Sequence, residues 1–242
     1  SVVGCEMSQM GRGGIVLVGG DRTTLTPARH IAANNHIHHY ARVKRVYQAG
    51  IQLQGVGNIA THNLIHDAPH MGMGFGGNDH LIEFNEIHHV CTESNDAGAI
   101  YTGRDWTMRG TIIRHNYLHH IGKTGSEAAV HGQAAIRFDD AISDMLVYGN
   151  VFYRCANGKF GAIQMNSGRD NLIDNNLFID CKQGISGGWY PGNNVWKTLN
   201  SGEKIAGFYQ NELYLDRYPK IAMMLDEPGV NHLWRNIFYR CG

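Results

Sequence analysis

The stretch Asn85-Glu-Ile-His-His89 is one copy of a block that recurs along most of the chain. Each copy has an Asn and an apolar residue two places later, and the copies in the first half of the chain contain His at the fourth position of the block. The other copies are Asn35-His-Ile-His-His39, Asn63-Leu-Ile-His-Asp67, Asn116-Tyr-Leu-His-His120, Asn150-Val-Phe-Tyr-Arg154, Asn176-Leu-Phe-Ile-Asp180 and Asn236-Ile-Phe-Tyr-Arg240. Recurrence at intervals of roughly 20–50 residues is typical of repeat proteins, in which loops of different length interrupt a constant frame.

A second block precedes most copies of the first and alternates apolar with variable residues. Its copies are Gly14-Ile-Val-Leu-Val18, Gly50-Ile-Gln-Leu-Gln54, Gly72-Met-Gly-Phe-Gly76, Gly98-Ala-Ile-Tyr-Thr102, Ala135-Ile-Arg-Phe-Asp139 and Ala162-Ile-Gln-Met-Asn166. A period of two is the pattern of a strand buried on one side. Short strands that stack in parallel register bury a continuous core. The sequence therefore predicts an all-β, right-handed parallel β-helix of about eight coils.

One long excursion interrupts the coils at residues 187–230. It is rich in aromatic residues, and the stretch Ile221-Ala-Met-Met-Leu225 after Pro219 predicts a short helix packed on the solenoid.

Composition argues for one soluble domain without nucleic-acid or membrane partners. Lys plus Arg and Asp plus Glu each number 21, so the formal net charge is zero and no basic excess favours phosphate binding. No stretch approaches the roughly 18 apolar residues that a membrane span needs. The chain starts in a strand-like run and ends within a repeat block. We therefore expect residues 1–242 to be a single β-helix domain from a longer protein.

The repeated Asn and His residues are predicted to be structural. Asn tolerates a left-handed backbone, and stacked Asn amides can hydrogen-bond along the solenoid axis. Stacking alone also produces columns of His, and carboxylates do not accompany these His residues in every coil. We therefore predict no metal site and no cofactor. Calcium at the Asp-rich loops is the alternative, although the chain has no recognisable calcium-loop motif.

The outward face of the second block is the candidate binding surface. Alignment of the copies predicts an inward stack of Leu17, Leu53, Phe75, Tyr101, Phe138 and Met165. The two outward columns are then Val18, Gln54, Gly76, Thr102, Asp139 and Asn166, and Val16, Gln52, Gly74, Ile100, Arg137 and Gln164. A flat polar face with amide, guanidinium and carboxylate groups suits a hydroxyl-rich ligand.

Carboxylates gather near this face, as glycoside hydrolysis requires. Asp96, Asp139 and Asp140 are the candidate catalytic residues, because the register turns Asp139 outward and the other two lie close to the strand ends. An extended backbone would place Asp96 and Asp139 roughly 20 Å apart, and only a loop that folds back over the strands could pair them. Asp105 and Asp139 are the shorter alternative, at about 10 Å.

Further residues are expected to contact a sugar from the rim and floor of this face. They are His70, Glu93, Arg104, Asp105, Trp106, Arg137, Gln164, Asn166 and Trp189. For Asp105 and Asp140, local hydrogen bonding to turn amides is the competing interpretation.

Several longer segments resemble bacterial right-handed β-helix proteins, similar in architecture to pectate lyases, that are related to the glycoside hydrolase family of α-L-fucosidases and xylanases. The segments are Gly19-Gly-Asp-Arg-Thr-Thr-Leu-Thr-Pro27, His66-Asp-Ala-Pro-His70, Asn95-Asp-Ala-Gly-Ala99, Thr102-Gly-Arg-Asp-Trp106, Phe138-Asp-Asp140, Gly168-Arg-Asp-Asn171 and Arg217-Tyr-Pro219. The resemblance implies an extracellular or periplasmic enzyme that acts on plant or algal polysaccharide. It also implies that Asp96 and one of Asp139 and Asp140 act as general acid and as base or nucleophile.

Two other functions stay open at the level of the sequence. A polysaccharide lyase would need a basic residue to abstract a proton, and Arg137, Arg104 or His70 could serve. A non-catalytic solenoid would use the same face only to hold glycan, because fold does not fix function. The sequence leaves the sugar, the stereochemical outcome and the oligomeric state undetermined.

Overall fold

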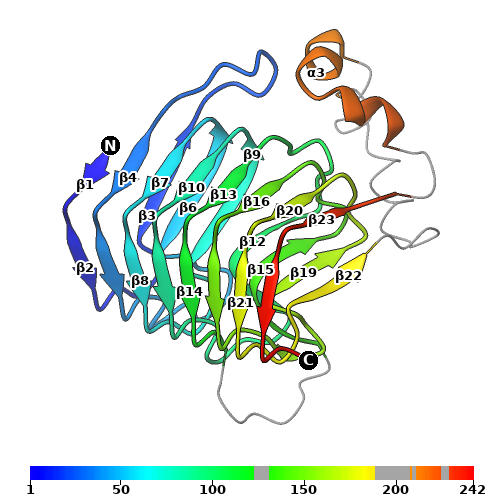
Figure 1. The fold of residues 1–242 in the computed structure, drawn as a ribbon. Coiled ribbons are helices and arrows are strands. Elements are labelled where there is room, and N and C mark those ends of the chain that lie inside the picture. The colour runs from blue at the N-terminus through cyan, green and yellow to red at the C-terminus, as the bar shows by residue number, and fades with distance from the viewer. Residues whose placement is uncertain (123–130, 189–207, 209–210, 225–228) are drawn as a thin grey trace.

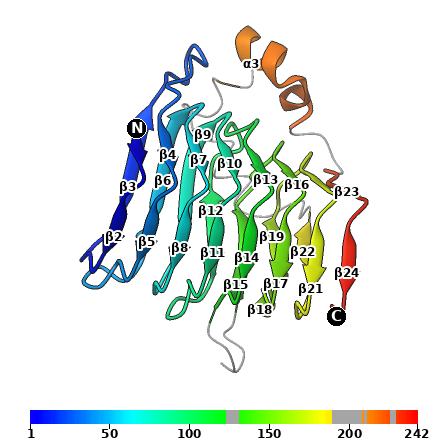
Figure 2. The ribbon, with the colours of Figure 1, turned by 60° about the vertical axis from the view of Figure 1, so that its left-hand side comes forward.

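The computed structural model describes residues 1–122, 131–188, 208, 211–224 and 229–242. These residues form three parallel sheets that run side by side along a solenoid, and each coil of the chain contributes one strand to each sheet in turn (Figure 1). Figure 2 shows the coils stacked in chain order from β2 to β24. The predicted parallel β-helix is thus confirmed.

Each sheet is built from strands of successive coils. The first contains β1 (Val2–Val3), β4 (Ile31–Ala33), β7 (Ile59–Thr61), β10 (Leu81–Glu83), β13 (Ile112–Arg114), β16 (Leu146–Tyr148), β20 (Leu172–Asp174) and β23 (His232–Trp234). The second contains β2 (Glu6–Ser8), β5 (His36–His38), β8 (Leu64–His66), β11 (Glu86–His88), β14 (Tyr117–His119), β17 (Val151–Tyr153), β21 (Leu177–Ile179) and β24 (Ile237–Tyr239). The third contains β3 (Ile15–Gly19), β6 (Ile51–Val56), β9 (Met73–Asn78), β12 (Ala97–Gly103), β15 (Gly132–Asp139), β19 (Ile163–Asn166) and β22 (Ile185–Gly188), and the short β18 (Asn157–Gly158) pairs antiparallel with β15.

The repeated Asn residues form a ladder through the solenoid. Each Asn from Asn35 to Asn176 donates from Nδ2 to Oδ1 of the Asn in the next coil, over 2.9–3.0 Å. The predicted amide stacking is confirmed. The left-handed residue, however, is the one before each ladder Asn, as at His62, Phe84 and His115, and not the Asn itself. The Asn side chain caps the turn while its neighbour supplies the positive φ.

The predicted register of β12 is wrong by one residue. In the structure Ile100 is level with Met73 and Ile136, whereas Tyr101 is level with Gly74 and Arg137. Ile100 and Thr102 are therefore buried, and Tyr101 points outward. A slip of one residue turns every side chain to the opposite face. Ile100 packs between Met73 and Ile136, and this contact decides which residues of β12 point inward.

The excursion after β22 carries α3 (Glu212–Arg217) and the 3-10 helix η1 (Pro219–Met223), which agrees with the expected helical segment. Leu225 lies outside the described residues. The helices cover a separate apolar cluster of Trp106, Ala141, Tyr214, Tyr218, Ile221 and Met224. Asn211 caps α3 by accepting a hydrogen bond from the backbone of Leu213 at 2.9 Å. Neither α3 nor any other helix in the described ranges is long and apolar enough to cross a membrane.

Candidate functional site

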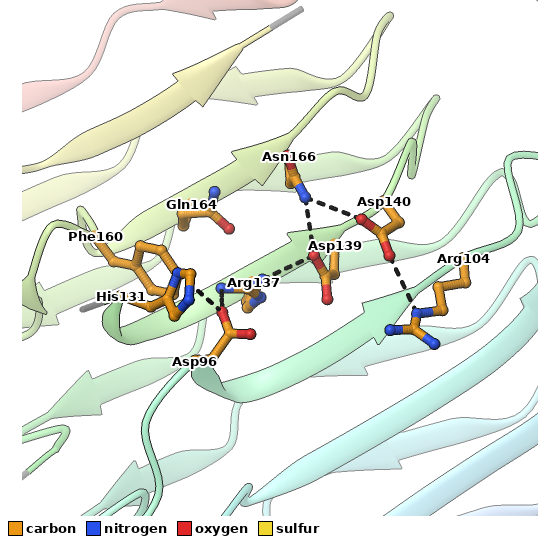
Figure 3. Close-up of a pocket in the computed structure, with 9 residues that line it drawn as sticks. All are labelled: Asp96, Arg104, His131, Arg137, Asp139, Asp140, Phe160, Gln164 and Asn166. Atoms are coloured by element: carbon orange, nitrogen blue, oxygen red, sulfur yellow. Dashed lines mark hydrogen bonds and ion pairs between the residues drawn. The ribbon is translucent and has the colours of Figure 1, made fainter. Parts of the chain in front are cut away.

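Seven of the predicted site residues meet in one pocket on the outer face of β12, β15 and β19. The pocket has a volume of about 340 Å³. Its lining consists of Asp96, Arg104, Arg137, Asp139, Asp140, Gln164 and Asn166, together with His131 and Phe160 (Figure 3). All three candidate catalytic carboxyl groups therefore belong to a single cavity.

Arg137 is the buried centre of the pocket. Its Nη1 lies 2.6 Å from Oδ1 of Asp96, and its Nη2 lies 2.8 Å from Oδ1 of Asp139. The guanidinium also stacks on the ring of Phe160, with Cζ 4.5 Å from the ring centroid. Figure 3 shows Arg137 between the two carboxylates. Asp96 and Asp139 thus pair with the same guanidinium. The separation of roughly 20 Å expected for an extended backbone does not apply, and the alternative of a chain that folds back over the strand face holds.

The start of β12 lies over the strand face and brings Asp96 to this position. Arg137 is level with Tyr101, yet a Cβ built on Gly98 would lie only 2.6 Å from Cβ of Arg137. Glycine permits this close approach of the backbone. In the neighbouring coil, the amides of Ala135 and Ile136 both donate to the carbonyl of Ala162, at 2.8 and 2.9 Å. The strands are irregular where the pocket forms.

Asp139 is held as a carboxylate by three donors. Oδ1 accepts from Arg137 and, at 3.2 Å, from Nδ2 of Asn166, while Oδ2 accepts from the hydroxyl of Tyr101 at 2.9 Å. Burial acts to raise the pKa of Asp139, but the charge of Arg137 and these hydrogen bonds outweigh it and lower the pKa. Asp139 is accordingly ionised and fixed in orientation.

Asp140 has the opposite electrostatic environment. Burial and the negative charge of Asp139 raise the pKa of Asp140, and the ion pair with Arg104 opposes this rise only in part. Nε of Arg104 lies 3.1 Å from Oδ2 of Asp140, and Nδ2 of Asn166 donates to its Oδ1 at 3.0 Å. Asp140 also has a positive φ, which turns it away from the regular path of β15.

Two predicted sugar contacts lie at other places on the solenoid. His70 is buried against the ring of Tyr47, 5.4 Å between centroids, and burial lowers its pKa to about 4. Glu93 forms an ion pair with Arg45 at the rim of a different cavity. Neither residue lines the pocket around Arg137, so the structure does not bring them together with the other predicted site residues.

Asp105 and Trp106 are also absent from the pocket lining. Asp105 accepts from the backbone and hydroxyl of Thr107 and pairs with Arg22 at 2.9 Å, which is the local turn role considered as the alternative. Trp106 is only 1% exposed, beneath the helices of the excursion, and cannot serve as a sugar platform. Trp189, the last predicted contact, lies outside the described residues.

Sequence reasoning missed Tyr101, His131 and Phe160. Tyr101 was placed inward by the incorrect register of β12, and its raised pKa, caused by burial and the charge of Asp139, keeps it a hydrogen-bond donor. Nδ1 of His131 lies 3.9 Å from Oδ1 of Asp96. The correct register of β12 would have placed Tyr101 on the outer face, whereas His131 and Phe160 belong to neither repeated block and have no signal in the sequence pattern.

Possible metal ligands gather elsewhere. Within the described ranges, the groups of three such side chains with donor atoms within 4.8 Å of one another are Glu6, His36 and His38, and Glu86, His88 and His119. Both groups lie on the second sheet and not in the pocket.

The pocket itself offers acid–base chemistry, because it combines an ionised carboxylate with a neighbour whose pKa is raised.

Comparison with known proteins identifies the fold but no individual relative. Residues 49–188, more than half of the chain, match the family model described as a right handed beta helix region. No curated protein and no solved structure matches the chain. The matched range begins just before β6, ends with β22 and includes the whole pocket.

Proposed function

The chain belongs to the right-handed β-helix family, and from that premise we propose that the pocket around Arg137 is the active site of a glycoside hydrolase acting on plant or algal polysaccharide. The fold is shared by polysaccharide-degrading enzymes and by other proteins, so the proposal depends on the site. The observation that carries it is the presence of three carboxyl groups in one cavity, with one pKa lowered and one raised.

Asp140 is the general acid in this proposal. Its raised pKa favours the protonated form, which can give a proton to the glycosidic oxygen as the bond to the sugar carbon breaks. Asp139 provides the negative charge that keeps this proton in place. Asp139 is a positioning residue in this proposal and not the base, because Arg137, Asn166 and Tyr101 together hold it as a carboxylate.

Asp96 is the base or nucleophile. The ion pair with Arg137 and the contact with His131 both involve Oδ1 of Asp96, and its side chain is 47% exposed, so water and substrate can reach it. It lies across Arg137 from the Asp139–Asp140 pair (Figure 3). As base it would take a proton from the attacking water and yield inversion, whereas direct attack on the sugar carbon would yield retention.

The contacts of Arg137 speak against the lyase alternative. Two carboxylates and an aromatic ring surround its guanidinium, and a guanidinium has N–H donors but no acceptor atom for a substrate proton. Of the other two candidate bases, His70 lies outside the pocket, and Arg104 lies in it as the ion-pair partner of Asp140.

The proposal is tested by measuring release of reducing ends from xylan, fucoidan, pectin and alginate by the wild type, Asp140→Asn and Asp96→Asn. Each variant should lose at least about 100-fold in kcat, as expected for removal of a general acid or base. Asp180→Asn is the matched control, because Asp180 pairs with Arg240 on a distant turn. It should retain full activity.

Three results would contradict the proposal. An unsaturated, ultraviolet-absorbing product would identify a lyase. Glycan binding without any product would identify a binding solenoid. Full activity of Asp140→Asn would remove Asp140 from the mechanism.

A further inference from the structure

A column of four imidazoles runs along the outer face of the second sheet, away from the pocket. The register places His38, His66, His88 and His119 level with one another on β5, β8, β11 and β14. Their rings are stacked, with centroid distances of 5.0, 4.6 and 4.6 Å between successive coils. Stacking explains the column itself, but it does not explain the carboxylate beside it.

Glu86 joins the column at its C-terminal end. It lies two residues before His88 on β11, and therefore on the same face of the strand. Oε1 of Glu86 is 3.2 Å from Nε2 of His119 in the next coil. One donor atom from each of Glu86, His88 and His119 lies within 4.8 Å of the other two. Glu86 is half exposed, so the cluster is open to solvent.

A second layer of imidazoles supports this cluster. Nδ1 of His88 lies 2.7 Å from Nδ1 of His89, and Nδ1 of His119 lies 2.8 Å from Nδ1 of His120. At these distances one ring of each pair must donate its Nδ1 proton to the other. When His88 and His119 are the donors, each keeps an unprotonated Nε2. A metal-binding imidazole usually has such an acceptor for its other N–H group.

We propose that Glu86, His88 and His119 form a binding site for a zinc-like divalent transition metal that links two adjacent coils. Two imidazoles and one carboxylate are a donor set of zinc, and they leave one position for water. Calcium and magnesium fit less well because they prefer oxygen ligands. In a tetrahedral site, bonds of about 2.0–2.2 Å bring donor atoms to about 3.5 Å from one another. The three donor atoms, which lie within 4.8 Å of one another, must therefore move closer by rotation of the side chains.

The group Glu6, His36 and His38 is the competing site for the same ion. Nε2 of His36 is already 2.8 Å from Nε2 of His66, so that nitrogen is engaged in a hydrogen bond. A variant that carries both His36→Ala and His38→Ala removes this group and isolates the proposed site.

The test is titration of this double variant, free of any affinity tag, with Zn²⁺ in a calorimeter and with Co²⁺ by visible absorption. One equivalent of Zn²⁺ should bind, and Co²⁺ should give the intense bands of a tetrahedral complex. Adding His119→Ala should abolish both signals. Adding His115→Ala should change neither, because His115 is an exposed imidazole that stacks on Phe84 outside the cluster.

Two further variants separate ligand loss from misfolding. Glu86→Gln should weaken Zn²⁺ binding at least ten-fold, and His120→Ala should weaken it by about 10–100-fold through loss of the supporting hydrogen bond. Circular dichroism of each variant should match that of the double variant. The proposal is overturned if the double variant binds no metal, or if the affinity is unchanged by both His119→Ala and Glu86→Gln.

Discussion

At the scale of single residues, the two neighbouring carboxyl groups of Asp139 and Asp140 have opposite pKa shifts. Arg137, Asn166 and Tyr101 supply charge and hydrogen bonds that stabilise the ionised form of Asp139. Asp140 receives less compensation for its burial and lies next to the charge of Asp139. Environments that separate the pKa values of two adjacent acids are typical of acid–base catalysis. This difference is the central feature of the site.

Replacement of Arg104 tests the electrostatic account through pH dependence. Arg104 lowers the pKa of Asp140, so Arg104→Gln should raise that pKa further. The general acid must be protonated to work, and the alkaline limb of the profile of kcat/KM against pH should therefore move to higher pH. Arg154→Gln, at an exposed arginine beside Tyr153, is the control and should leave the limb in place. A shift to lower pH in Arg104→Gln would contradict the assignment of Asp140 as the acid.

At the scale of elements, the Asn ladder couples each coil to the next. In the middle of the ladder, Oδ1 of Asn116 accepts hydrogen bonds from the backbone amide and Nδ2 of Asn85, and Nδ2 of Asn116 donates to Asn150 and to the carbonyl of Ile82. These groups are buried, so removal of the amide leaves several polar atoms without partners.

Asn116→Ala should therefore lower the free energy of unfolding by about 3 kcal/mol, because more than one buried group loses its hydrogen bond. Asn236→Ala is the matched comparison. Asn236 is the last rung of the ladder in the described residues and is only half-buried, so its loss should cost about 1 kcal/mol. Urea denaturation measures both values. Equal losses at the two positions would mean that the ladder does not couple the coils in the proposed way.

At the scale of the whole molecule, buried neutral histidines make the stability of the solenoid sensitive to acid. Burial lowers the pKa of His70 from 6.5 to about 4. The unfolded chain therefore binds a proton at a higher pH than the folded chain does. The stabilising contribution of neutral His70 is complete above about pH 6.5 and is lost as the pH falls toward 4.

Between pH 6.5 and 4, His70→Gln should lose up to about 3 kcal/mol less of its free energy of unfolding than the wild type does, because the titrating group is absent. Unfolding curves at a series of pH values measure the effect. His62→Gln, at an exposed histidine, should leave the slope of the wild type unchanged. If the free energy of unfolding of His70→Gln fell with pH as steeply as that of the wild type, His70 would not be held neutral in the folded state.

The repeat made the architecture predictable, because Asn and apolar positions recur at fixed offsets. It also placed Asp139, Arg137, Gln164 and Asn166 on one face. Which residues of β12 point inward was not predictable, because both Ile100 and Tyr101 can occupy an apolar position. Stacking against the neighbouring coils decides between them. Packing of the excursion over Trp106 is likewise a tertiary effect that no local pattern reveals.

Titration of the carboxyl groups by NMR, with ¹³C-labelled Asp and assignment by Asp96→Asn, Asp139→Asn and Asp140→Asn, tests the central claim most directly. It requires no knowledge of the substrate. The account predicts that Asp139 titrates below the ordinary range of a carboxyl group and Asp140 above it. It also predicts that the pKa of Asp140 falls in Asp139→Asn, because the neighbouring charge is gone. Titration of both groups at the same ordinary pH would contradict it.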